Sequence, residues 1–82
     1  MKTINWSTKA VRQLRKILDL GEQDKIYHGI QALIHFPECR NVKKLESRDQ
    51  YRLRVGRWRV LFSESLEIIE IQEVKKRNGR TY

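Results

Sequence analysis

The sequence predicts one α+β domain over residues 1–82, in which an antiparallel pair of helices packs on one face of a small antiparallel sheet. Three observations predict this class. Apolar residues alternate with polar ones at the start of the chain and again beyond residue 50, as in strands. Between these regions they recur at helical spacing. The length of 82 residues suits a single domain near the small end of what folds alone. The expected order is β-α-α-β-β-β.

A short strand and a helix come first. The opening residues alternate, with Ile4 and Trp6 on one side of the expected strand. Ser7 or Thr8 can then cap a helix that ends at Gly21. Its apolar residues fall on one face: Val11, Leu14, Ile17 and Leu18.

A second helix is expected to begin near Glu22 or Asp24 and to stop at Pro37. It carries a stripe of residues at the spacing of a buried helix face: Ile26, Tyr27, Ile30, Leu33 and Ile34. Because the connection between the two helices is very short, they should run antiparallel.

A polar loop is expected over residues 37–50, followed by a hairpin. Gly56-Arg57 favours a two-residue type II′ turn, which fixes the pairing of the two hairpin strands. The expected pairs are Tyr51 with Phe62, Arg52 with Leu61, Leu53 with Val60, Arg54 with Arg59, and Val55 with Trp58. A turn at residues 63–67 then leads to a last strand over residues 68–74.

This register separates an apolar face from a basic one. Directly opposed residues share a face of the sheet, so the apolar residues of both strands should turn towards the helices. The opposite face, called here the arginine face, carries Arg52, Arg54 and Arg59, together with Leu61. Two opposed arginines repel at a cost of a few tenths to about 1 kcal/mol. A guanidinium can grip phosphate or carboxylate through two parallel hydrogen bonds, so this surface invites an anionic ligand.

An ordinary salt-bridged surface is the alternative. If Ile69 and Ile71 of the last strand turn inward, Glu70 and Gln72 lie on the arginine face. Glu70 could then neutralise one arginine. The residues alone leave both interpretations open.

Composition narrows the class of partner. Eighteen Lys and Arg residues against ten Asp and Glu give a formal charge of +8, which favours a polyanion or an acidic protein. The single Cys39 excludes an internal disulfide and is expected to be a semi-buried residue without a catalytic task. We find no zinc-like spacing and no carboxylate cluster, so we expect no metal and no cofactor. The absence of a signal-peptide pattern and of a membrane span favours the cytoplasm.

Other candidate residues have structural interpretations. His28 and His35 lie on the second helix with no carboxylate placed to orient them, which indicates exposed histidines without a catalytic task. Trp6 and Trp58 are expected in the core or at its edge, and Tyr27 is expected to pack.

Three stretches together resemble the RelE/ParE toxin superfamily of bacterial type II toxin–antitoxin systems. They are Asn41-Val-Lys-Lys-Leu45, Tyr51-Arg-Leu-Arg-Val-Gly-Arg-Trp-Arg-Val-Leu-Phe62, and Ile69-Glu-Ile-Gln-Glu-Val74 before a basic run that ends in tyrosine. The expected order of elements and the length also match, so the resemblance covers nearly the whole chain.

The resemblance implies a toxin that a co-expressed antitoxin holds inactive. RelE-type members enter the ribosomal A site and cut the bound mRNA without a metal ion, which inhibits translation. The 2′-hydroxyl of the mRNA attacks the adjacent phosphate and leaves a 2′,3′-cyclic phosphate. ParE-type members share the fold, act on DNA gyrase and lack the nuclease residues. A basic module that binds nucleic acid without cleaving it is a third interpretation.

The resemblance also assigns roles to residues, and these favour the nuclease branch. Arginines could hold the scissile phosphate and stabilise its transition state, while a tyrosine could stack on a base or orient the 2′-hydroxyl. The implied catalytic set is Arg52, Arg54, Arg59, Arg77 and Tyr82, with Arg80 as a competitor for the position of Arg77. The residues implied to contact RNA or the ribosome are Lys43, Lys44, Arg48, Arg57, Lys75, Lys76 and Arg80.

The chain departs from the best-known family member, which has lysines at the positions of Arg52 and Arg54. Lysine can become neutral and act as a base, whereas arginine stays protonated. The identity of the general base is therefore open, with Tyr82 as one candidate.

Overall fold

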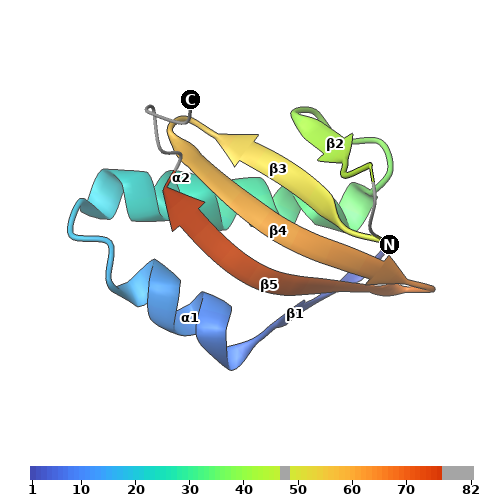
Figure 1. The fold of residues 1–82 in the computed structure, drawn as a ribbon, viewed down its shortest axis with the longest axis horizontal. Helices are drawn as coiled ribbons and strands as arrows, with labels where there is room; N and C mark the ends of the chain where they lie inside the picture. Colours follow the sequence, from blue (N-terminus) through green and yellow to red (C-terminus); the bar gives the residue numbers. More distant parts are fainter. Residues whose placement is uncertain (47–48, 77–82) are drawn as a thin grey trace.

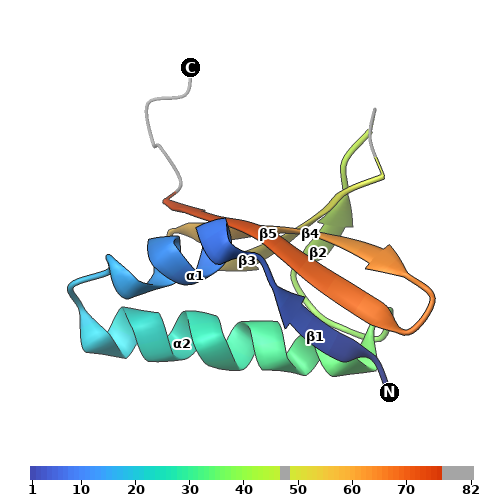
Figure 2. The same ribbon diagram turned by 90° about the horizontal axis from the view of Figure 1, so that it is seen from below.

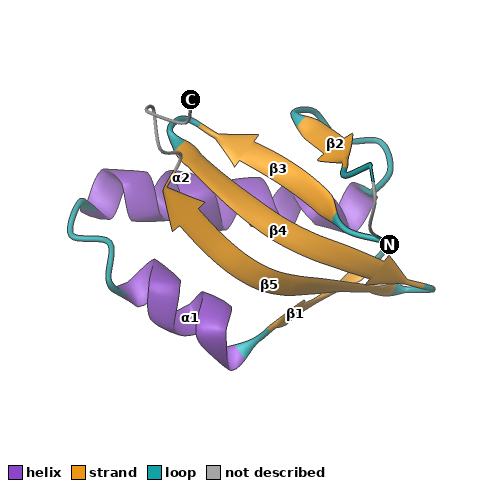
Figure 3. Cartoon of the chain, viewed as in Figure 1, coloured by secondary structure: helices purple, strands orange, loops and turns teal. Residues whose placement is uncertain are grey.

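A five-stranded sheet forms one layer of the molecule and two helices form the other, with both helices on the same face of the sheet (Figures 1 and 2). The computed structural model describes residues 1–46 and 49–76. The elements are β1 (Thr3–Trp6), α1 (Thr8–Arg15), α2 (Leu20–Gln31), the 3-10 helix η1 (Ala32–His35), β2 (Val42–Lys44), β3 (Tyr51–Val55), β4 (Trp58–Ser65) and β5 (Ile68–Lys76). The predicted α+β class is confirmed (Figure 3).

The sheet is mixed, with strand order β1-β5-β4-β3-β2. β1 runs parallel to β5, with Ile4 opposite Ile69 and Trp6 opposite Ile71, whereas all other pairs are antiparallel. The expectation of a purely antiparallel sheet was therefore wrong for this strand. A parallel pair needs a long connection, and the two helices and the middle strands provide it.

The loop expected over residues 37–50 contains a strand that the sequence did not reveal. β2 pairs with β3 and places Val42 opposite Leu53 and Lys43 opposite Arg52. Three residues, two of them lysines, are too few to show alternation. Edge strands are commonly short and rich in lysine, because this discourages pairing with other chains.

The hairpin of β3 and β4 has the predicted register in all five pairs. Gly56 has a φ of 57°, as the first central residue of a type II′ turn requires. Leu53, Val60 and Phe62 are buried in the core beneath this hairpin. β4 continues to Ser65, further than expected, so the next turn is shorter than residues 63–67.

The two helices begin where side chains cap them. Ser7 Oγ accepts a hydrogen bond from the backbone N–H of Ala10 at 3.0 Å, which confirms the predicted cap of α1. Asp19 Oδ1 accepts from the N–H groups of Gly21 and Glu22 and so caps α2. Gly21 therefore lies in the first turn of α2 and does not end α1.

The buried faces of the helices follow the predicted stripes with two exceptions. Ile26, Ile30 and Leu33 are fully buried, as expected. Leu18 is 96% exposed because α1 ends at Arg15, so its predicted place on the buried face was wrong. Tyr27 is 43% exposed and stacks on Trp6, with 6.3 Å between the ring centroids. The helices run in opposite directions, as predicted (Figures 1 and 2).

α1 lies along the part of β5 that β1 does not reach (Figure 1). Two side chains, one from the residue that caps α1 and one from α1 itself, form hydrogen bonds with the backbone of this strand edge. Ser7 Oγ donates to the carbonyl of Gln72 at 3.1 Å, and Gln13 Oε1 accepts from the N–H of Val74 at 2.6 Å. The helix segment thus replaces a neighbouring strand.

β5 contains a bulge at Gln72. Ile71 lies opposite Phe62, whereas Glu73 lies opposite Leu61, so Gln72 is an extra residue between the two pairs. The bulge reverses the alternation of the strand. Val74 is consequently buried opposite Val60, and Lys75 lies opposite Arg59.

Candidate nucleic-acid interface

The arginine face is the side of the sheet that the helices leave open. The helices cover the side on which Leu53, Val60 and Phe62 are buried. Alternation along the strands turns Arg52, Arg54 and Arg59 to the other side. In the described part of the chain, no helix lies on that side (Figure 2).

Two rows of side chains cross the arginine face. Residues directly opposed on neighbouring strands form a row, and the strands are about 4.8 Å apart. The first row, called the cation row, is Arg54 of β3, Arg59 of β4 and Lys75 of β5. The second row is Lys43 of β2, Arg52 of β3, Leu61 of β4 and Glu73 of β5. Three of the direct cross-strand pairs in these rows therefore join like charges.

Glu73, the carboxylate of the second row, forms ion pairs with lysines. Glu73 Oε1 lies 3.3 Å from Lys9 Nζ and 3.6 Å from Lys75 Nζ. Within residues 1–46 and 49–76, no ion pair joins Arg54, Arg59 or Glu70 to an opposite charge. Within the described residues, Glu70 therefore does not neutralise Arg54 or Arg59.

Arg59 is the half-buried centre of the cation row. Its Nε atom is buried and has no hydrogen-bond partner among the residues that the structure describes. A buried donor without a partner costs about 1–3 kcal/mol, which an anionic ligand bound there would recover. Arg54, by contrast, is exposed.

A shallow hollow of about 220 Å³ opens between β2 and β3. It is lined by Asn41, Val42, Lys43, Arg52 and Arg54. Asn41 and Val42 were not among the predicted site residues, because no alternation or turn signal marks a strand there. The hollow adjoins the cation row at Arg54.

The residues predicted to contact RNA divide between the two sides of the sheet. Lys43 and Lys75 lie on the arginine face. Lys44 lies opposite Tyr51 and Lys76 opposite Trp58, so both belong to the side that faces the helices. Arg57, at the hairpin turn, pairs with Glu22 of α2 (Nε to Oε2, 3.3 Å). Lys44, Lys76 and Arg57 therefore do not share the surface of Lys43 and Lys75, because neighbouring residues of a strand point to opposite faces.

Four predicted residues lie outside the described residues: Arg48, Arg77, Arg80 and Tyr82. Their roles, and the choice between Arg77 and Arg80, stay predictions.

The remaining candidates are distant from this face. His28 Nδ1 lies 3.4 Å from Asp24 Oδ1, so the expectation that no carboxylate accompanies it was wrong, although both side chains are exposed on α2. Cys39 is partly buried as predicted, and burial, reinforced by the charge of Glu38, raises the pKa of its thiol. Trp6 and Trp58 are partly buried and pack against the core, as expected.

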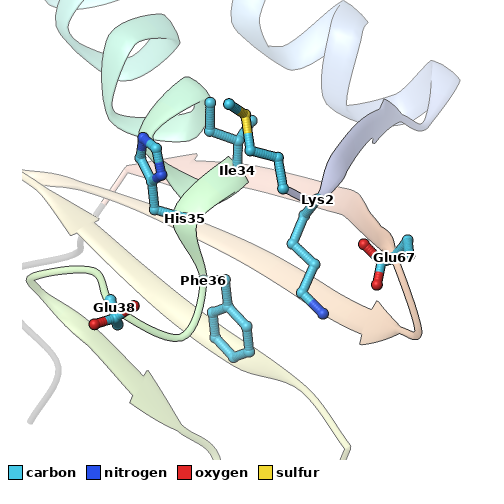
Figure 4. Close-up of a pocket in the computed structure, with 7 residues that line it drawn as sticks. Lys2, Ile34, His35, Phe36, Glu38 and Glu67 are labelled. Carbon is cyan, nitrogen blue, oxygen red and sulfur yellow. The ribbon is translucent and has the colours of Figure 1, made fainter.

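Two depressions larger than the hollow between β2 and β3 also occur among the described residues. A polar one of about 310 Å³ contains residues from the N-terminus, η1 and the last turn (Figure 4). Its Lys2 is bound to Glu64 at 2.7 Å, and this contact raises the pKa of Lys2. An apolar groove of about 460 Å³ runs between the end of α2 and β3 and shares Asn41 and Arg54 with the hollow.

Metal and membrane signals are absent from the part of the chain that is described. No group of three or more His, Cys, Asp or Glu side chains there could hold a metal ion. None of the described helices combines the length and the apolar character that crossing a membrane requires.

This architecture is similar to that of solved toxin–antitoxin structures. The RelE–RelB complex from the archaeon Pyrococcus horikoshii contains a chain with a TM-score of 0.81 and 26% identity, and the match covers 98% of each chain. The chain has the fold that the toxins of the RelE/ParE superfamily share. No protein-family model matches the sequence, and no curated protein matches it.

The fold alone does not select a branch of the RelE/ParE superfamily. A chain of the chromosomal ParDE system from P. aeruginosa has a TM-score of 0.81 at 16% identity, covering 95% of this chain and 98% of that one. Isolated E. coli RelE has a TM-score of 0.77 at 13% identity, covering 95% and 86%. The neighbours are toxins of toxin–antitoxin systems from both branches, so the side chains must decide between them.

Proposed function

We propose that this chain is the toxin of a type II toxin–antitoxin pair and that it acts in the cytoplasm as a ribosome-dependent, metal-independent mRNA endonuclease. The observation that carries the proposal is the cation row on the open face of the sheet. Arg54 and Arg59 are directly opposed there, and neither is paired with a carboxylate within the described residues. A fold retains such repulsion at a cost, and a phosphodiester would relieve it.

The proposed reaction uses the RNA as its own nucleophile. The 2′-oxygen of one nucleotide forms a bond to the adjacent phosphorus, and the bond from phosphorus to the 5′-oxygen of the next nucleotide breaks. The 5′-oxygen takes up a proton as it leaves, so the products are a 2′,3′-cyclic phosphate and a 5′-hydroxyl. Arg54 and Arg59 would bind the non-bridging oxygens, and the charge of Arg52 beside them would help to stabilise the pentacovalent transition state.

These arginines do not provide the general base, because a guanidinium keeps its proton at neutral pH. The proton of the 2′-hydroxyl must pass to another group, for which Tyr82 stays a candidate. Positioning of the RNA by the ribosome would account for a large part of the rate. The antitoxin is expected to be a small protein that brings carboxylates to the arginine face.

The test is to map RNA ends after induced expression of the chain. We expect growth arrest and new 5′-hydroxyl ends within translated codons. Arg59→Gln should lower the cleavage by about 100-fold, the usual effect of removing one donor to a transition-state oxyanion. Arg15→Gln removes the same charge from the exposed end of α1 and should cleave normally.

A ParE-like action on DNA gyrase is the second candidate, since the ParDE neighbour fits the fold equally well. Purified chain added to a gyrase supercoiling assay distinguishes the two. Inhibited supercoiling together with unchanged mRNA ends would replace the nuclease proposal. Absence of growth arrest, of cleavage and of gyrase inhibition would leave only a binding module.

A further inference from the structure

We propose that the hollow between β2 and β3 is a second phosphate subsite, which holds a phosphate next to the one bound by the cation row. The inference rests on the proposed function in that the ligand is an RNA strand. It adds a defined site, a role for Lys43 and a requirement for the substrate: two consecutive phosphates.

The geometry of the hollow suits an anion. Lys43 and Arg52 are directly opposed across β2 and β3, and Arg54 lies two residues further along the same face, about 6–7 Å from Arg52. All three line the hollow of about 220 Å³. Three cations therefore meet in one depression.

The described residues that line the hollow include no carboxylate. Within residues 1–46 and 49–76, neither Lys43 nor Arg54 forms an ion pair. Lys43 and Arg52 are directly opposed, as Arg54 and Arg59 are in the cation row. A phosphate in the hollow would compensate the charges of Lys43 and Arg54.

The backbone fixes the walls of the hollow. The carbonyl of Asn41 accepts a hydrogen bond from the N–H of Arg54 at 2.9 Å, which ties the start of β2 to the end of β3. Asn41 has a φ of 61°, a conformation that asparagine tolerates better than most residues. The cations are thus held on paired strands rather than on a free loop.

Arg54 belongs to both the hollow and the cation row, so the two phosphate subsites are neighbours. An RNA strand that places one phosphate between Arg54 and Arg59 would reach the hollow with the next. Lys43 lies outside the cation row, so it would bind the substrate without contacting the reacting atoms.

Short ligands that cannot be cleaved provide the test. We would compare a 2′-deoxy dinucleotide that has only its internal phosphate with the same dinucleotide carrying an added 5′- or 3′-phosphate, and follow binding by NMR titration. In the wild type, one of the two additions should tighten binding by about tenfold or more, the effect of a charge-assisted contact. Amide signals of Lys43, Arg52 and Arg54 should shift.

Two neighbouring variants form a matched pair. Lys43→Gln and Lys44→Gln remove the same charge from adjacent exposed residues on opposite sides of the sheet. The gain from the added phosphate should disappear in Lys43→Gln and persist in Lys44→Gln. No gain in the wild type, or a gain that survives in Lys43→Gln, overturns the subsite.

Failure of this inference is distinguishable from failure of the proposed function. Cleavage on ribosomes that is as efficient in Lys43→Gln as in the wild type overturns the subsite and leaves the nuclease. A phosphate gain that depends on Lys43 in a chain that cleaves no mRNA supports the subsite and rejects the nuclease. If the subsite and the nuclease activity are both real, Lys43→Gln should raise the KM for mRNA and leave kcat unchanged.

Discussion

Arg54 and Arg59 face each other across two strands, yet their surroundings differ. Arg54 is exposed, so water and salt screen its charge. Arg59 is half-buried, and its Nε has no partner within the described residues. The two residues should therefore differ in what they contribute: Arg59 fixes the position of a bound phosphate, whereas Arg54 mainly adds charge.

Arg54→Gln should stabilise the free protein by a few tenths to about 1 kcal/mol, because it removes repulsion from Arg59. Urea unfolding at low and high salt measures this, and the gain should shrink as salt screens the pair. Arg57→Gln is the control, since it breaks the pair with Glu22 and should give no gain. A loss of stability in Arg54→Gln would show that its guanidinium is held by favourable contacts.

At the scale of elements, the segment of α1 protects the open edge of β5. Gln13 is partly buried and accepts the N–H of Val74, next to the lysine that completes the cation row. The position of Lys75 thus depends on a side chain more than sixty residues earlier in the chain.

Gln13→Ala should destabilise the fold by about 1–3 kcal/mol, because the N–H of Val74 loses its acceptor. Urea unfolding gives the free energy, and amide hydrogen exchange at Val74 should become faster. Arg12→Ala, an exposed neighbour on the same helix, should change stability by less than about 0.5 kcal/mol. Equal effects of the two changes would mean that the hydrogen bond adds little.

Sequence reasoning succeeded where two local signals agreed. The β3–β4 hairpin has both a turn pair and a long alternation, so its register and the places of Arg52, Arg54 and Arg59 were predictable. β2 has no such signal, and the bulge of β5 adds a residue that places Val74 opposite Val60 and Lys75 opposite Arg59. The side on which Lys43 and Lys75 lie therefore depended on tertiary structure.

At the scale of the whole molecule, the formal charge of +8 does not describe the binding surface. Only part of the charge gathers on the arginine face, while other cations pair with carboxylates or lie on the helix side. The placement of charge, and not its total, should govern RNA binding.

Two triple variants separate the effect of where the positive charges lie from the effect of the net charge. The first variant changes the arginine face and combines Lys43→Gln, Arg54→Gln and Lys75→Gln. The second variant changes other surfaces and combines Lys44→Gln, Arg57→Gln and Lys76→Gln. Each lowers the formal charge of +8 by three.

Binding of single-stranded RNA should weaken strongly only in the first triple variant. The slope of log affinity against log salt should also become shallower by about 2, because each phosphate that the protein no longer neutralises removes roughly 0.7 from the slope. Fluorescence anisotropy between about 50 and 200 mM salt measures both quantities. Equal weakening in the two variants would mean that net charge alone attracts RNA.

The bulge at Gln72 also determines how this strand can change in length. Deleting that one residue would make the pairs of Ile71 with Phe62, Glu73 with Leu61 and Val74 with Val60 consecutive, so Val74 would stay in the core and Lys75 would stay beside Arg59. Deleting Val74 instead would put Lys75 opposite Val60, on the buried face. This strand should therefore tolerate the loss of Gln72 far better than the loss of Val74.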